Sequence, residues 1–260
     1  MFNGLVDDCK SDRMKQLNGW KRNREITLDK YKEEVDKLNR KFPWYVAEML
    51  GGLSANKTFF AATGTSWRDY GVLTILSIEL IAKITQAVGA EFVEVDINQA
   101  YPKLLYSLAG VDFPTEDFYG GADNPKRYKN KISVNVAVNN SFYDITKGSN
   151  KSRQRLNKYN RLVEVGFDAK VADYALSVAF DKSKSEMFNI LSSNEKIIID
   201  QLKKELKRKM GIECNVHRRH DSVLIFNSYD KLNDNDGLAR LLQEFKYRGE
   251  THWFKDIGFF

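Results

Sequence analysis

The segment from residue 91 to residue 97 most strongly constrains the fold, because apolar and acidic residues alternate along it. A period of two residues is typical of a β-strand. From Ala100 to Leu108 the apolar residues return at helical spacing, so a helix is expected directly after the strand. The carboxylate of Asp96 is therefore predicted to lie at a strand end.

Several other segments have apolar residues at helical spacing. Pro43 is expected to stop the first helix, and Ser66 with Asp69 forms a capping box for the second. Ser193 is expected to cap a later helix that ends at Gly211. The predicted helices span residues 29–42, 66–88, 167–178, 193–210 and 237–247.

Two further strands are predicted near the C-terminus, at residues 212–216 and 223–226, around a polar turn at 217–220. Asp221 then lies where the second of these strands begins. The glycine-rich stretch 119–125 predicts a loop and a subdomain boundary. Between residues 132 and 138 the apolar residues alternate as in a strand.

Composition places the chain among globular proteins, with 260 residues, 42% hydrophobic and 12% aromatic residues. Lys and Arg number 41 and Asp and Glu 35, a net charge of +6 that favours a polyanionic partner. Two cysteines fit a reducing compartment. No signal peptide is expected, and the longest apolar stretch, 72–82, is too short for a membrane span. We therefore expect a cytoplasmic protein without membrane contact.

Asp96 and Asp221 carry the chemical interest of the sequence. An unpaired carboxylate at the end of a buried strand costs several kcal/mol, so each acid requires a cation or a donor. Taken alone, either residue is more typical of a turn or helix cap.

The motifs around the two acids resemble those of family B DNA polymerases. The string Asp96-Ile97-Asn98-Gln99-Ala100-Tyr101-Pro102 is similar to their first palm motif, and His220-Asp221-Ser222-Val223 to their third. Between them, Asn140-Ser141-Phe142-Tyr143-Asp144 is similar to the fingers motif Asn-Ser-x-Tyr-Gly. The three matches occur in the order of the family and cover roughly residues 90–230.

The resemblance implies an α/β (α+β) fold: a compact polymerase palm with an antiparallel sheet, reduced fingers and a helical N-terminal region. In this interpretation residues 1–89 form the helical region, and 90–123 with 190–235 the palm. Residues 124–189 form a fingers-like insertion, for which the family favours a helix over 132–138. Residues 236–260 form a C-terminal element, a thumb remnant.

The activity implied is template-directed nucleotidyl transfer, with deoxynucleoside triphosphates and primed DNA as partners. Two Mg²⁺ ions, or Mn²⁺, would be held by the carboxylates of Asp96 and Asp221 and by Ile97, since hard oxygen ligands suit these ions. Tyr101 would lie under the sugar, or alternatively in the core. The nucleotide would also contact Asn140, Tyr143 and Lys147. Because 260 residues is short for this family, a partner subunit is expected to supply missing thumb or fingers, in a viral system that acts in an infected host cell.

Basic residues provide candidate phosphate contacts, which dominate affinity for nucleic acids. Alternatively, the basic run at residues 147–161 is only the solvated face of a helix. The candidates are Lys131, Arg153, Arg155, Lys158, Arg161, Arg218, Arg219 and Lys246.

Departures from the family pattern keep two alternatives open. Val136 stands where the fingers motif has a lysine, and Asp144 replaces its glycine, so a catalytically inactive, nucleic-acid-binding palm is one alternative. Arg219 and His220 replace the first two residues of the Asp-Thr-Asp-Ser motif, and His-Asp-Ser is similar to phage-type single-subunit RNA polymerases. Cys214, His217 and His220 supply only three potential zinc ligands, where a structural site requires four.

Overall fold

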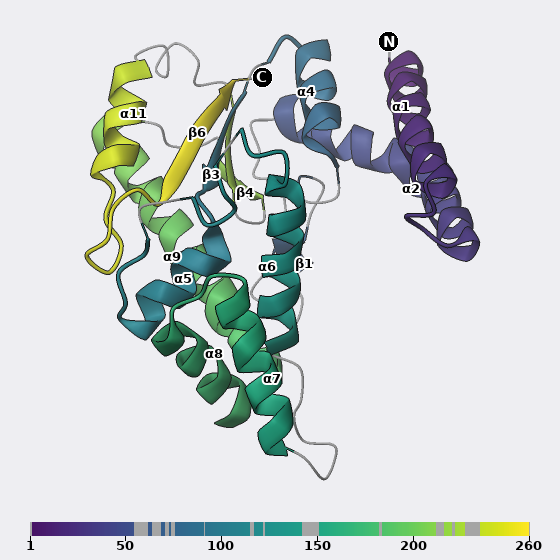
Figure 1. Cartoon of the computed structure of the whole chain (residues 1–260). Helices are drawn as coiled ribbons and strands as arrows, with labels where there is room; N and C mark the ends of the chain where they lie inside the picture. Colours follow the sequence, from purple (N-terminus) through teal and green to yellow (C-terminus); the bar gives the residue numbers. More distant parts are fainter. Residues whose placement is uncertain are drawn as a thin grey trace.

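The computed structural model has a mixed, α+β architecture of helices around an antiparallel sheet (Figure 1). It describes residues 2–54, 62–63, 69–70, 73, 76–90, 92–114, 117–121, 123–141, 151–181, 184–211, 216–219, 222–226 and 235–259. In this part of the chain the main sheet has the strand order β4-β5-β3-β6, with every neighbouring pair antiparallel. The strands are β3 (Phe92–Ile97), β4 (Val216–Arg219), β5 (Ser222–Phe226) and β6 (Phe254–Phe259).

The two faces of this sheet have different neighbours. Val93, Val95 and Ile97 of β3 lie on the face that packs against α5 (Ala100–Ala109) and α9 (Lys184–Met210), and we call it the helix-covered face. Phe92 lies on the opposite face, where it joins an apolar cluster with α2 (Leu28–Ser54) and α4 (Ile78–Ala87). Antiparallel strands alternate their side chains in this way, so one strand contributes to two separate cores.

The N-terminal helices form a layer of their own beside the sheet. α1 (Phe2–Arg22) packs against α2, and both contact α4. Pro43 lies inside α2, so the prediction that it ends the helix is wrong. The buried residues Leu38, Phe42, Val46 and Met49 continue the apolar face across the proline.

Helix α4 begins later than predicted. Its N-cap is Ser77, whose hydroxyl accepts a hydrogen bond from the Leu80 amide at 3.4 Å. The predicted cap Ser66 lies outside the described residues, and Asp69–Tyr70 forms the short strand β2, paired with β1 (Ala62–Thr63). The helix ends as predicted, before Gly89 in the left-handed region at φ 67°.

The described residues between 127 and 181 include three helices: α6 (Arg127–Ser141), α7 (Lys151–Glu164) and α8 (Ala169–Asp181). They pack on one another and, through α8, on α5. The alternation over 132–138 does not form a strand, and the helix implied by the resemblance is present there. Buried Val134, Ala137 and Val138 have helical spacing, whereas Ile132 and Val136 are 45% and 37% exposed. The apparent period of two arose from these two exposed residues.

The C-terminal part also differs from the sequence-based expectation. α9 starts at Lys184 rather than at Ser193, because Met187 and Leu191 extend its buried face toward the N-terminus. Residues 217–219, predicted as a turn, belong to β4, while residues 212–215 lie outside the described residues. After α11 (Asn235–Glu244), the aromatic tail forms β6, a strand the sequence did not predict, which pairs with β3.

Candidate active site on the central sheet

Asp96 lies near the end of β3, as predicted, with a strand on either side. Its Cα partner on β5 is Ser222, the residue that follows Asp221, and its partner on β6 is Lys255. β3 and β5, the strands next to the two acidic motifs, are thus antiparallel neighbours. Asp221 and His220 themselves lie outside the described residues.

The side chain of Asp96 belongs to the face opposite the helix-covered one. The alternation of β3 places Phe92, Glu94 and Asp96 on this polar face, and the register adds Ser222 and Leu224 of β5. Phe92 and Leu224 are buried, whereas Glu94 and Asp96 are half-buried. The polar face is thus apolar near Phe92 and Leu224, and it is rich in oxygen ligands near Asp96 and Ser222.

Glu94, Ser222 and Arg219 form a hydrogen-bonded group beside Asp96. The Ser222 hydroxyl donates to Glu94 Oε1 at 2.8 Å, and the Arg219 guanidinium reaches the same oxygen at 3.2 Å. The side chains of Arg219 and Glu94 are each 20% exposed. Sequence reasoning missed Glu94, although its position two residues before Asp96 on a strand places both on one face.

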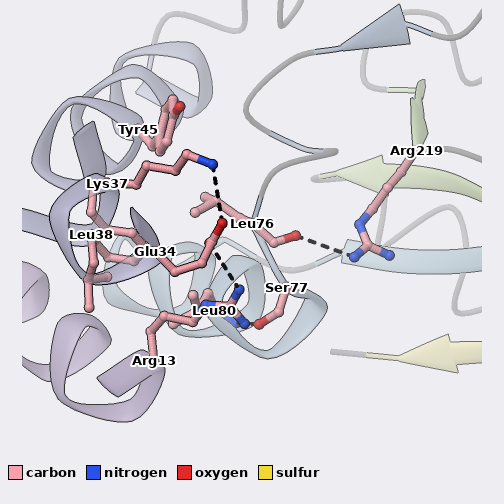
Figure 2. Close-up of a pocket in the computed structure, with 10 residues that line it drawn as sticks. Arg13, Glu34, Lys37, Leu38, Tyr45, Leu76, Ser77, Leu80 and Arg219 are labelled. Carbon is pink, nitrogen blue, oxygen red and sulfur yellow. Dashed lines mark hydrogen bonds and ion pairs between the residues drawn. The ribbon is translucent and has the colours of Figure 1, made fainter. Parts of the chain in front are cut away.

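Arg219 also ties the sheet to the segment before α4. Its Nε donates to the carbonyl of Leu73 at 3.0 Å, and a terminal nitrogen donates to that of Leu76 at 3.3 Å. Figure 2 shows this side chain reaching from the sheet toward Leu76. Arg219 was predicted to contact nucleic acid; its donors here serve the protein itself, and the phosphate contact stays a prediction.

A cavity of about 270 Å³ lies beside Arg219 (Figure 2). Its lining combines an apolar floor, including Leu38, Leu76 and Leu80, with charged groups from α1 and α2. Arg13 and Lys37 both approach the carboxylate of Glu34, at 4.0 Å and 3.2 Å. The cavity thus lies where residues of α1, α2 and α4 meet Arg219 of β4.

The turn after β3 holds the backbone in a strained conformation. Gln99 has left-handed angles, φ 49° and ψ 48°, which cost a non-glycine residue of the order of 1 kcal/mol. The buried Gln99 side chain accepts a hydrogen bond from the Phe118 amide at 2.8 Å, and the Asn98 amide donates to the Trp253 carbonyl at 2.7 Å. These bonds fix the chain that leaves Asp96.

The remaining predicted ligands of the nucleotide and metal are distributed as follows. Ile97 is 1% exposed on the helix-covered face, so only its backbone carbonyl could serve a metal. Tyr101 lies in the first turn of α5, half-buried against the main core, which fits its alternative role there. Asn140 ends α6 with its side chain outside the described residues, and Tyr143 and Lys147 lie outside them altogether.

Most basic candidates lie away from the sheet. Lys131 on α6 and Arg153, Arg155 and Arg161 on α7 are exposed, and Lys158 is half-buried on the same helix. Lys246, after α11, is exposed, and the side chain of Arg218 lies outside the described residues. The arginines of α7 therefore form a charged surface on the helical layer formed by α6–α8.

Within the part of the chain that the structure describes, no three His, Cys, Asp or Glu side chains lie together as metal ligands would. Asp221 is not among the residues searched. The described helices include none with the length and hydropathy to cross a membrane.

Comparison with protein-family models, with curated proteins and with solved structures finds no match for this chain. The class established by fold and site is thus an α+β protein with an acidic strand end on one face of an antiparallel sheet. Its activity is therefore inferred from its own residues alone.

Proposed function

We propose that this chain catalyses template-directed nucleotidyl transfer, with Asp96 and Asp221 as the metal-binding carboxylates of a compact polymerase palm. The observation that carries the proposal is the register of β3 and β5, in which Ser222, next to Asp221 in the sequence, lies opposite Asp96. Neighbouring strands are about 4.8 Å apart, so we expect Asp221, 125 positions after Asp96 in the sequence (221 − 96), at the same end of the sheet.

The chemistry of the polar face supports the same interpretation. Carboxylates are the hard oxygen ligands that Mg²⁺ prefers, and Mn²⁺ accepts the same ligands. When bound, such a metal pair lowers the pKa of an attacking hydroxyl and neutralises a leaving pyrophosphate. Asp96 and Asp221 would hold the ions, and the α7 surface would bind the phosphates of primed DNA, with a partner subunit supplying missing thumb or fingers.

The decisive experiment compares Asp96→Asn, Asp221→Asn and the matched control Asp200→Asn, an exposed position on α9. A neutral amide cannot bridge two cations, so both site variants should lose Mg²⁺-dependent primer extension while retaining the wild-type melting temperature. The control should keep both properties. Full activity in either site variant would overturn the assignment, and loss of folding would favour a structural role for that acid.

The sugar preference separates a DNA polymerase from the phage-type RNA polymerase alternative. If Tyr101 lies under the sugar, its ring excludes a 2′-hydroxyl by steric contact, and Tyr101→Ala should relax the preference for deoxynucleotides. The ratio of kcat/KM for the two sugars measures this discrimination. A wild-type preference for ribonucleotides would favour the RNA polymerase.

A second candidate function, an inactive palm that binds nucleic acid, is favoured by two observations. Arg219 neutralises Glu94 beside the site, and Val136, which stands where the fingers motif has a lysine, is an exposed aliphatic residue. Calorimetric titration with Mn²⁺ separates the two candidates. An enzyme should bind Mn²⁺, and Asp96→Asn should abolish this binding. An inactive palm should bind DNA without binding Mn²⁺.

A further inference from the structure

A second cleft, of about 530 Å³, lies where β3 passes into α5. One wall is the turn of Asn98 and Gln99 with Lys103 and Phe113, and the other is the loop that joins α11 to β6, with Glu250 and His252. Its volume falls within the usual range of ligand-binding clefts, about 300–1,000 Å³. Asp96 does not line it, so it is distinct from the proposed active site.

Lys103 is the most unusual residue of this cleft, because a lysine is only 5% exposed there. Its ammonium donates to the carbonyls of Thr251 and His252, at 2.7 Å and 2.9 Å. It also lies 5.0 Å from the centre of the Trp253 ring and 5.6 Å from that of Phe113. An ammonium has three donors, and these bonds use two of them. Burial lowers the pKa of Lys103, which means that its charge is incompletely compensated.

Glu250 supplies the complementary group. Its Oε2 has no hydrogen-bond partner among the described residues, although it is shielded from solvent. Burial raises the pKa of this carboxyl, and the nearby Ser107 hydroxyl and the charge of Lys103 oppose the shift. A buried acceptor without a partner costs about 1–3 kcal/mol, so a ligand that supplies donors to Glu250, which lines the cleft, would relieve this cost.

The backbone of both walls is held in place before any ligand arrives. Gln99 and His252 have left-handed φ angles of 49° and 58°, and Gly249 has φ 85°. Lys103 ties the second wall to α5, and the Asn98 amide ties the turn to Trp253. Strained residues retained in this way cluster at binding sites, and a preorganised cleft loses little entropy on binding.

We infer that this cleft binds a guanine base, with Lys103 donating to the O6 carbonyl and Glu250 accepting from the N1 and N2 hydrogens. A carboxylate accepts two parallel donors, which guanine presents and adenine does not. The Phe113 ring in the wall offers an aromatic contact of the kind that bases use. Guanine binding here does not depend on nucleotidyl transfer, because no residue of the cleft is a proposed metal ligand.

The test is calorimetric titration of the Asp96→Asn protein in EDTA with GMP, IMP and AMP, conditions that remove the proposed metal site. GMP should bind at least tenfold more tightly than AMP, with IMP, which lacks the N2 amine, between them. Glu250→Gln should weaken GMP binding at least tenfold, and the exposed control Glu244→Gln should not.

Lys103→Met should weaken GMP binding in the same way, provided its melting temperature shows that the protein folds. If it does not fold, Glu250→Gln keeps the test decisive, because it is nearly isosteric and leaves the bonds of Lys103 to Thr251 and His252 in place. Equal affinities for the three nucleotides would mean that only the phosphate is bound, and would overturn the inference. An unchanged affinity in Glu250→Gln would overturn it as well. Because the titration uses inactive protein, failure of the polymerase proposal leaves its outcome interpretable.

Discussion

The two faces of the central sheet use the same strands for different purposes. On the helix-covered face, Val93, Val95 and Ile97 of β3 are at most 1% exposed and contribute to a continuous core. On the polar face, Phe92 is buried by apolar neighbours, while Glu94 is bound to Ser222 and Arg219. The comparison teaches that the helix-covered face is apolar along all of β3, whereas the polar face changes along the strand from an apolar cluster to hydrogen-bonded polar groups.

The largest expected contrast comes from neighbouring residues of β3. Ile97→Ala should cost about 2–5 kcal/mol of unfolding free energy, because it leaves a cavity in the main core. Asp96→Asn, of nearly unchanged volume, should cost less than about 1 kcal/mol, typical of substitutions that create no cavity. Urea denaturation of both variants measures the difference. A larger loss in Asp96→Asn than in Ile97→Ala would contradict the assignment of the two faces.

A pH effect on stability should arise from His217 on the polar face. This residue is 6% exposed and contacts the Phe226 ring, and burial with the nearby charge of Lys203 lowers its pKa to about 4. The unfolded chain then binds a proton between pH 6.5 and pH 4 that the folded protein does not. Stability should therefore be complete above about pH 6.5 and fall as the pH decreases, by about 3 kcal/mol at most.

His217→Gln should remove this decrease in stability, as measured by the difference in unfolding free energy between about pH 7 and about pH 5. His252→Gln is the matched control, since His252 is exposed. The same pH dependence in both variants and the wild type would contradict this prediction, because the folded protein would then bind the proton on His217 as readily as the unfolded chain.

A smaller effect is expected from the Arg219–Glu94 pair, which links β3 and β4. A double-mutant cycle of Arg219→Met and Glu94→Gln should give a coupling energy of about 1–2 kcal/mol, because both side chains are largely shielded from solvent. Glu33 and Lys37 provide an exposed control pair on α2, for which less than about 0.5 kcal/mol is expected. A coupling energy of zero would mean that Glu94 does not hold Arg219, and would favour the predicted contact of Arg219 with a phosphate.

The smallest effect on stability, but a clear one on binding, should come from α7. Replacing Arg153, Arg155, Lys158 and Arg161 by Ala changes only exposed or half-buried side chains of α7. If these residues bind phosphates, the slope of log K against log salt for duplex DNA should fall by about 0.9 for each phosphate that is no longer neutralised. An unchanged slope would mean that α7 is only a solvated face.

The local elements were predictable where one face of a segment packs against a single partner. β3, α5, the α4 terminus at Gly89 and the described residues of the loop predicted at 119–125 follow from alternation, helical spacing and glycine. The predicted helix bounds were wrong where packing against other elements decides how far a helix extends. Helix α2 continues past Pro43, and α9 begins before Ser193, because buried residues continue the apolar face of each helix. The strand β6 depends on its pairing with β3, which no local pattern reveals.

For the candidate site, the sequence alone determined the residue types: Asp96 at a strand end, and a basic surface on α7. The tertiary structure decided that Ser222 lies opposite Asp96, that Arg219 binds Glu94, and that Lys103 meets the loop after α11. Sequence patterns encode which side of an element is apolar, because that depends on residues three or four positions apart. Which distant groups meet depends on the packing of whole elements, and this is fixed only when the core closes.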